Sequence, residues 1–210
     1  KELGMLDEAI ACYRSALFIN PDYFISLNNL GNALKEKLDF EAAVEAFNKA
    51  LLIHPSCADT FNNLGGTFRA IGNLNEATRC YQKALLLCPE QSDTYNNLGH
   101  ALNDLGRLDE AVEAYKKALS ANPKHAVARA TKIHRQAHIC DWSDLETDKA
   151  HSMNVGVVDK PAPPFAFFSI EDAPDRHLKR SQNYSKHRIS GTLQTQAFNL
   201  RQKPDRLRIG

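Results

Sequence analysis

Alanines and aromatic residues recur along the first 125 residues in a pattern that repeats every 34 residues. Each unit has one aromatic residue with an alanine four positions before it and another three positions after it, as in Ala43, Phe47 and Ala50. These spacings place the three side chains on one face of an α-helix. The same pattern occurs at Ala9, Tyr13 and Ala16, at Ala77, Tyr81 and Ala84, and at Ala111, Tyr115 and Ala118. One helix of this kind is therefore predicted in every unit.

A second helix is predicted in each unit, before the aromatic one. A Leu-Gly pair recurs there at the same interval, and a proline follows each aromatic helix, where a residue that cannot continue a helix forces a turn. We expect first helices over residues 24–37, 58–71 and 92–105, and second helices over residues 40–52, 74–86 and 108–120. The glycines are Gly31, Gly65 and Gly99, and the prolines are Pro21, Pro55, Pro89 and Pro123.

The three glycines lie inside predicted helices, where glycine costs about 1 kcal/mol relative to alanine. That cost is explained if two helices approach there too closely for a side chain. A 34-residue unit with small residues at these places is typical of tetratricopeptide repeats. The sequence therefore predicts an all-α fold, a superhelical solenoid of antiparallel helix pairs.

The repeat pattern divides the chain into three predicted parts. Residues 1–125 are expected to form the repeats, residues 126–150 a capping helix and linker, and residues 151–210 a connector. The first part comprises a half repeat over 1–23 and repeats that start at 24, 58 and 92, so we expect the natural protein to continue upstream. After residue 125 we expect helices over 126–138 and about 173–187, a short helix capped by Asp141 or Ser143, and a strand over 205–210.

Each complete first helix carries two adjacent asparagines before its Leu-Gly pair. They are Asn28 and Asn29, Asn62 and Asn63, and Asn96 and Asn97. Asparagine costs up to about 0.7 kcal/mol in a helix interior, so this repetition needs a reason. A side-chain amide can bind both the C=O and the N–H of an extended peptide, and helices stacked about 8–10 Å apart offer one amide at about every third peptide residue. We therefore predict a peptide-binding concave face, against the alternative that duplication copied solvated asparagines.

Two aspartates extend this predicted site. Asp59 and Asp93 lie four residues before Asn63 and Asn97, one turn back on the same face, whereas the first repeat has Ile25 there. The aspartates are expected to accept hydrogen bonds from Ser or Thr, or to pair with basic residues, of a bound peptide. A clamp for the carboxylates of chaperone C-termini needs lysine and arginine on this face, so the sequence argues against that kind of site.

Composition and charge narrow the function classes further. The chain is 43% apolar and 24% charged with a net charge of +1, which excludes a globally basic nucleic-acid binder, and no apolar run approaches the ~20 residues that span a membrane. Residues 1–125 carry 12 basic and 16 acidic side chains, and residues 126–210 carry 14 and 9. The later basic residues, such as Arg129, Lys132 and Arg135, are expected either to dock against a more acidic lobe or to be solvated. Five cysteines without a CxxC pair indicate reduced thiols and a cytoplasmic location, or a nucleocytoplasmic one in a eukaryote.

Four features together resemble protein O-GlcNAc transferases. They are the Asn-Asn-Leu-Gly repeats, Cys140-Asp141-Trp142, the stretch PPFAFFSIEDAP over 163–174, and Arg-Leu-Arg-Ile-Gly over 206–210. The resemblance implies a repeat arm that binds extended segments of protein substrates, joined to a catalytic lobe that transfers N-acetylglucosamine from UDP-GlcNAc to Ser or Thr. A SPINDLY-like protein O-fucosyltransferase, which uses GDP-fucose, and a non-catalytic interaction scaffold are the alternatives.

The resemblance also assigns roles to residues. It places Asn29, Asn63 and Asn97 in an asparagine ladder that holds the acceptor peptide, and Asp59 and Asp93 in a column that influences substrate choice.

At the end of the repeats the resemblance is less regular. Thr131 interrupts the asparagine pattern, and His134 matches a histidine close to the family's active site, with an ordinary helix histidine as the alternative. His134, His138 and Cys140 lack a fourth ligand for a metal site. In the family, the donor-binding and catalytic residues come mainly after the Arg-Leu-Arg-Ile-Gly strand. The 210 residues alone are therefore expected to hold no cofactor and to be inactive.

Overall fold

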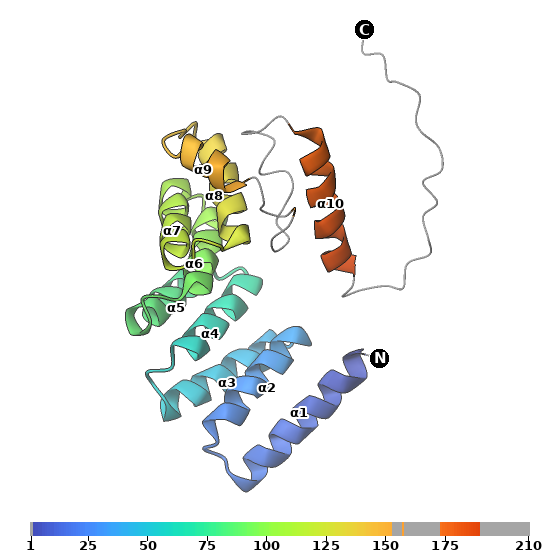
Figure 1. Cartoon of the computed structure of the whole chain (residues 1–210). Coiled ribbons are helices and arrows are strands. Elements are labelled where there is room, and N and C mark those ends of the chain that lie inside the picture. The colour runs from blue at the N-terminus through green and yellow to red at the C-terminus, as the bar shows by residue number, and fades with distance from the viewer. Residues whose placement is uncertain (1, 153–156, 158–172, 190–210) are drawn as a thin grey trace, which may run out of the picture.

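The computed structural model of the protein describes residues 2–152, 157 and 173–189 (Figure 1). These residues form ten α-helices and contain no strand. The helices are α1 (Glu2–Ile19), α2 (Phe24–Glu36), α3 (Phe40–Ile53), α4 (Ala58–Ala70), α5 (Leu74–Leu87), α6 (Ser92–Asp104), α7 (Leu108–Ala121), α8 (Ala126–His138), α9 (Leu145–Ser152) and α10 (Pro174–Ile189). The predicted all-α fold is confirmed, and the strand predicted over 205–210 lies outside the described residues.

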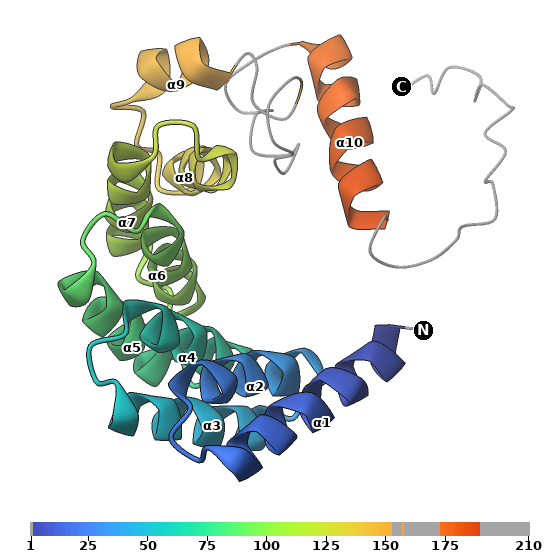
Figure 2. The same ribbon diagram turned by 60° about the horizontal axis from the view of Figure 1, so that its bottom comes forward.

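The helices from α1 to α9 stack side by side into a curved array. Figure 2 shows α2, α4, α6 and α8 along the inner side of the arc and α3, α5 and α7 along its outer side. The inner helices are therefore the predicted first helices of the repeats, and their ends differ from prediction by one residue at most.

The beginning of α9 corrects one prediction. The helix starts at Leu145, so neither Asp141 nor Ser143 directly precedes it. Asp141 instead accepts a hydrogen bond from the backbone N–H of Ser143 at 3.0 Å, and it thereby shapes the turn before the helix. The carbonyl of Asp144 receives the N–H of Asp148 at 2.8 Å.

The core of each repeat is an aromatic ring of the second helix packed on a glycine of the first. A Cβ on Gly65 would lie 2.8 Å from the ring of Tyr81, and one on Gly99 would lie 2.5 Å from the ring of Tyr115. Gly31 meets Phe47 in the same way, at 2.6 Å. The prediction that these glycines leave no room for a side chain is confirmed, but the reason differs: the rings of the second helices, rather than the helix backbones, occupy the space.

Left-handed residues make the turn between the two helices of a repeat, and they too are 34 residues apart. Gly72 and Gly106 have φ angles of 84° and 76°, and Leu38 and Cys140 take the same conformation at 65° and 55°. Glycine adopts this conformation freely, whereas a residue with a Cβ costs roughly 1–2 kcal/mol there. Because Cys140 belongs to this series, the turn from α8 to α9 has the geometry of the turns inside the repeats.

The side chains between α8 and α9 do not follow the repeat. Lys132, Ile133 and Gln136 stand one repeat after Leu98, Gly99 and Leu102. No aromatic ring is supplied by α9, since Lys149 stands one repeat after Tyr115. The apolar contact of the earlier repeats is thus replaced here.

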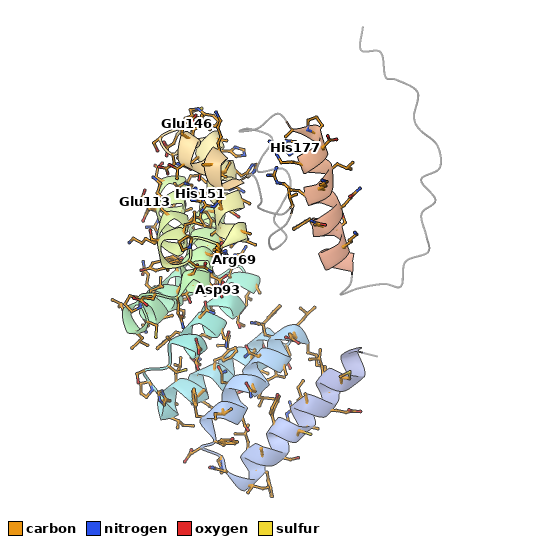
Figure 3. All side chains as sticks on the ribbon, viewed as in Figure 1. Arg69, Asp93, Glu113, Glu146, His151 and His177 are labelled. Atoms are coloured by element: carbon orange, nitrogen blue, oxygen red, sulfur yellow. The ribbon has the colours of Figure 1, made fainter. Side chains whose placement is uncertain are left out.

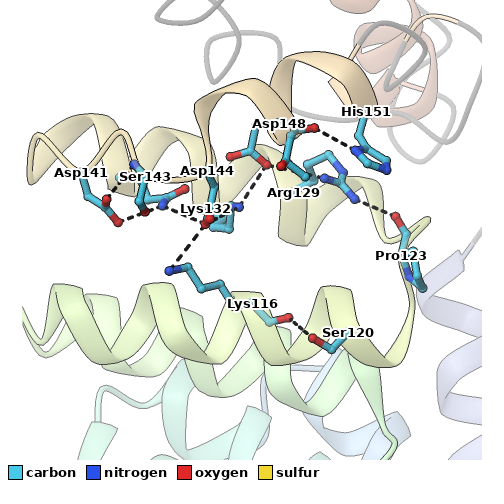
Figure 4. A network of polar contacts seen from close by, with 12 residues as sticks. Lys116, Ser120, Pro123, Arg129, Lys132, Asp141, Ser143, Asp144, Asp148 and His151 are labelled. Atoms are coloured by element: carbon cyan, nitrogen blue, oxygen red, sulfur yellow. Dashed lines mark hydrogen bonds and ion pairs between the residues drawn. The ribbon is translucent and has the colours of Figure 1, made fainter.

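Ion pairs take the place of that contact (Figure 4). Lys132 Nζ lies 3.0 Å from Asp148 Oδ1 and 3.1 Å from Asp144 Oδ2, and Arg129 lies 3.5 Å from Asp148. The side chains of Lys132 and Asp148 are only 5% and 4% exposed. Burial raises the pKa of the Asp148 carboxyl in spite of these cations. The prediction that Arg129 and Lys132 face solvent or another lobe is wrong, because both are buried against the Asp148 carboxylate of α9.

None of the helices in the described part of the chain combines the length and the apolar character needed to cross a bilayer.

Candidate functional site: the inner face of the array

One strip of each inner helix stays open to solvent, as α4 illustrates. Successive residues turn by about 100° around a helix. Asp59 and Gly66 therefore fall along the middle of the strip, and Asn62 and Asn63 fall on its two flanks. These four residues are exposed or half-buried, whereas Leu64 is buried. The two asparagines of a pair consequently point toward different neighbouring repeats.

The first asparagine of the first two pairs belongs to a contact between repeats. Asn28 Oδ1 accepts a hydrogen bond from Thr60 Oγ1 at 3.1 Å, and Asn62 Oδ1 accepts one from Asn97 Nδ2 at 3.0 Å. Asn96 is only 8% exposed, and its Oδ1 has no hydrogen-bond partner among the described residues. The resemblance assigned only the second asparagine of each pair to the ladder; the contacts of the first asparagine were not predicted, although the offset of about 100° between the two was a signal for them.

The asparagine contacts between neighbouring inner helices stop at α8 for a local reason. Where α4 and α6 have Thr60 and Thr94, α8 has Ala128, which offers no side-chain donor. Thr131 replaces the next ladder asparagine, and its hydroxyl donates to the carbonyl of Val127 at 2.9 Å. No side chain of α8 is therefore available to continue the series.

The second asparagines lie where the sequence predicted a ladder, one on each inner helix. Asn29, Asn63 and Asn97 are half-buried. Within the described part of the chain, the side-chain amides of Asn29 and Asn63 make no hydrogen bond, and Asn97 uses a single N–H. The three amides thus keep donors and acceptors available on the inner face.

The two aspartates contact the beginning of the next inner helix. Asp59 Oδ1 accepts a hydrogen bond from Gln91 Nε2 at 2.9 Å, and Asp93 Oδ1 lies 3.0 Å from His125 Nε2. His125 Nδ1 accepts the backbone N–H of Ala128 at 3.1 Å, so the proton of the neutral ring belongs on Nε2, which donates to Asp93. The Asp93 side chain remains 92% exposed (Figure 3). Each carboxylate keeps an oxygen for another partner.

A further row lies one turn along the inner helices, at Asn32, Gly66, His100 and His134. His100 Nδ1 lies 3.2 Å from the hydroxyl of Tyr115. Burial, with a smaller effect from nearby cations, lowers the pKa of His100 to about 4, so the ring is neutral at neutral pH. This contact was not foreseen from the sequence, since it requires Tyr115 to reach through the helix layer beside Gly99.

His134 lies in this row on α8. Its ring packs edge-on against that of His138, with centroids 4.8 Å apart at an interplanar angle of 88°. Burial and the neighbouring Arg135 and His138 lower the pKa of His134. The described residues contain no group of three or more His, Cys, Asp or Glu placed to hold a metal. A role for His134 near an active site stays a prediction.

Arg69, the basic residue of α4, already forms an ion pair. Arg69 Nε lies 2.8 Å from Asp104 Oδ2 of α6, so the pair links two neighbouring inner helices (Figure 3 labels Arg69). A cation neutralised in this way is a poor anchor for a bound carboxylate.

Comparisons with known proteins agree with this architecture. Profiles of the tetratricopeptide repeat match residues 1–37, 24–57 and 56–124. Among curated proteins, none matches the sequence. The structure is similar to MamA, with 20% identity, a TM-score of 0.64, and coverage of 87% of this chain and 92% of that one.

Two further solved structures are similar in fold. YrrB, described as a TPR protein with an unusual peptide-binding site, is 22% identical with a TM-score of 0.59, over 73% of this chain and 79% of its own. The first TPR domain of Spaghetti (RPAP3), bound to the HSP90 peptide SRMEEVD, is 18% identical with a TM-score of 0.54, over 56% of this chain and 93% of its own. The contiguous profile matches show that residues 1–124 consist of tetratricopeptide repeats, and the solved structures share the fold of the array.

Proposed function

We propose that the inner face of the array binds an extended segment of a partner protein through Asn29, Asn63 and Asn97. The observation that carries this proposal is the row that these residues form, with one half-buried amide on each of three successive inner helices. An amide that is held in place without using all its hydrogen bonds can bind the backbone of any extended chain. The interaction is therefore expected to depend little on the sequence of the partner.

The aspartates give this face a preference among partners. Asp59 and Asp93 each keep a free carboxylate oxygen beside the asparagine row, and Arg69 is neutralised by Asp104. Beside these two aspartates the face favours serine, threonine or basic side chains of the partner and disfavours acidic ones. The proposed partner thus differs in charge from the HSP90 peptide bound to the RPAP3 domain.

The test uses a host peptide of twelve residues, alternately alanine and serine, labelled with fluorescein. Replacing Asn29, Asn63 and Asn97 with alanine is expected to weaken its binding by roughly 10-fold or more. The reason is that each lost hydrogen bond is worth about 0.5–1.5 kcal/mol. Fluorescence anisotropy measures the affinity, and circular dichroism checks that helicity is unchanged.

The control replaces Asn48 and Asn75, which are exposed on the second helices α3 and α5. These substitutions are expected to leave the affinity for the host peptide unaltered. Equal affinity in the wild type and the ladder variant would contradict the proposal and leave only the solvated asparagines.

We propose further that this arm belongs to a glycosyltransferase of the O-GlcNAc transferase type. The support is the sequence resemblance, above all at Cys140-Asp141-Trp142. In the structure Asp141 accepts a hydrogen bond from Gln136 Nε2 at 2.9 Å, which fixes the turn, and Trp142 is 45% exposed beside it. A partly exposed tryptophan next to a fixed turn suits the docking of another domain.

A donor assay tests this second proposal. The full-length protein is expected to transfer N-acetylglucosamine from UDP-GlcNAc to the host peptide, whereas residues 1–210 alone are expected to transfer none. Mass spectrometry of the peptide detects the product. Transfer of fucose from GDP-fucose instead would favour the SPINDLY-like alternative, and no transfer from either donor would favour the interaction scaffold.

A further inference from the structure

The aromatic rings that pack on the glycines reach through the layer of inner helices. The hydroxyl of Tyr115 ends beside His100, the residue that follows Gly99. By the same geometry the hydroxyl of Tyr81 ends beside Gly66, the residue that follows Gly65. A Cβ built on Gly66 would meet the Tyr81 Oη at 3.8 Å and no other atom outside its own helix within 4 Å. The tip of Tyr81 therefore borders an open space on the inner face.

The packing of the core does not require a glycine at position 66. At Gly65 the ring of Tyr81 excludes any side chain, whereas at Gly66 an added Cβ meets only an ordinary van der Waals contact. Glycine inside a helix costs about 1 kcal/mol relative to alanine, and nothing in the described core recovers that cost at Gly66. A binding role for the opening would explain why glycine occupies this position.

The three repeats differ at this position. In α2 the residue is Asn32 and the ring behind it is Phe47, which has no hydroxyl. In α6 the hydroxyl is already bound to His100. Only at Gly66, among the described repeats, does a tyrosine hydroxyl without a protein partner meet an opening.

We propose that Gly66 and the Tyr81 hydroxyl form a specificity site, which receives one side chain of the bound segment and donates a hydrogen bond to its terminal carboxamide or carboxylate oxygen. The inference rests on the proposed peptide-binding function and names a residue preference within it. Gly66 lies three residues after Asn63, on the adjacent part of the open strip, so a backbone held by Asn63 brings a side chain to the opening.

The chemistry of the hydroxyl suits a donor. Burial raises the pKa of Tyr81 to about 12, so the group keeps its proton at neutral pH. Arg69 adds a smaller effect of the opposite sign, and Asp104, its partner, offsets part of it. A neutral donor in a largely buried setting stabilises a bound oxygen acceptor through a hydrogen bond, and it forms no such bond with the end of an apolar side chain.

The test places a single guest residue, Gln, Glu, Leu or Met, in the middle of the alanine–serine host peptide. Because the host binds through its backbone, it can shift along the row until the guest reaches the opening. The wild type is expected to bind the Gln guest about fivefold more tightly than the Met guest, which has a similar length, and the Glu guest more tightly than the Leu guest. Tyr81→Phe is expected to abolish both preferences while leaving the affinity for the host peptide unchanged.

Two further variants separate the site from its surroundings. Gly66→Leu fills the opening and is expected to remove the preference, whereas Tyr115→Phe removes a hydroxyl already bound to His100 and is expected to preserve it. If the host peptide binds but all four guests bind equally, the specificity site is wrong and the peptide-binding function stands. If the host peptide does not bind at all, the proposed function itself is wrong, and the specificity site with it.

Discussion

Replacing Gly65 with alanine is expected to destabilise the array although alanine is the better helix former. The new Cβ would lie 2.8 Å from Cε1 and 2.9 Å from Cδ1 of Tyr81. The ring cannot retreat easily, because Ala77 and Ala84 are fully buried on either side of it along α5. Overpacking of this kind costs about 1–3 kcal/mol, more than the roughly 0.5–1 kcal/mol that alanine contributes to the helix.

The adjacent glycine provides the matched control. Gly66→Ala gains the same helix propensity but meets only the Tyr81 hydroxyl at 3.8 Å, so it is expected to raise stability slightly. Urea denaturation followed by circular dichroism measures both variants, and the midpoints should move in opposite directions. A fall of both midpoints, or a rise of both, would contradict the ring-on-glycine account of the core.

Replacing Asp148 with alanine is expected to release α9 from the end of the array. The substitution leaves Lys132 and Arg129 buried beside each other without their shared carboxylate. Removing one partner of a buried ion pair costs about 3–5 kcal/mol, whereas an apolar contact would have tolerated the change better. Because α9 is the short last helix of the curved array, the loss appears as local opening, and amide exchange over residues 145–152 should accelerate about 100-fold or more.

An exposed ion pair on the same helix serves as the control. Glu146 lies 3.3 Å from Lys149 and its side chain is 87% exposed. Such pairs contribute only about 0–1 kcal/mol, so Glu146→Ala should change exchange over α9 by less than about fivefold. Equal exchange in the two variants would show that the buried ion pairs do not hold α9 in place.

The sequence predicted the repeats well because their period is carried by small and large residues that must interlock. Gly99 and Tyr115 can be recognised as partners once their positions are seen to recur with the other glycines and rings. The contact between α8 and α9 could not be predicted in this way. There the backbone turn persists at Cys140 while the apolar residues are replaced, and charges such as Lys132 carry no periodic signal of burial.

For the candidate site, the sequence predicted the right helices but not the contacts between them. The asparagine pairs were visible as residues that cost helix stability. The different contacts of Asn62 and Asn63, however, depend on the angle between neighbouring helices. The pairing of Asp93 with His125 spans two repeats and likewise needs the stacking geometry. The opening at Gly66 is invisible in the sequence, because Gly66 has no glycine counterpart in the other repeats and its position beside the Tyr81 hydroxyl depends on how α5 packs on α4.

The central claim is that the ladder asparagines hold the backbone of an extended partner. The most direct measurement is the nuclear magnetic resonance of the asparagine side-chain amides during titration with the alanine–serine host peptide. The account predicts that the amide signals of Asn29, Asn63 and Asn97 shift together and exchange more slowly with solvent, while those of Asn48 and Asn75 stay unchanged. Saturable peptide binding that leaves the three ladder amides unshifted would contradict it.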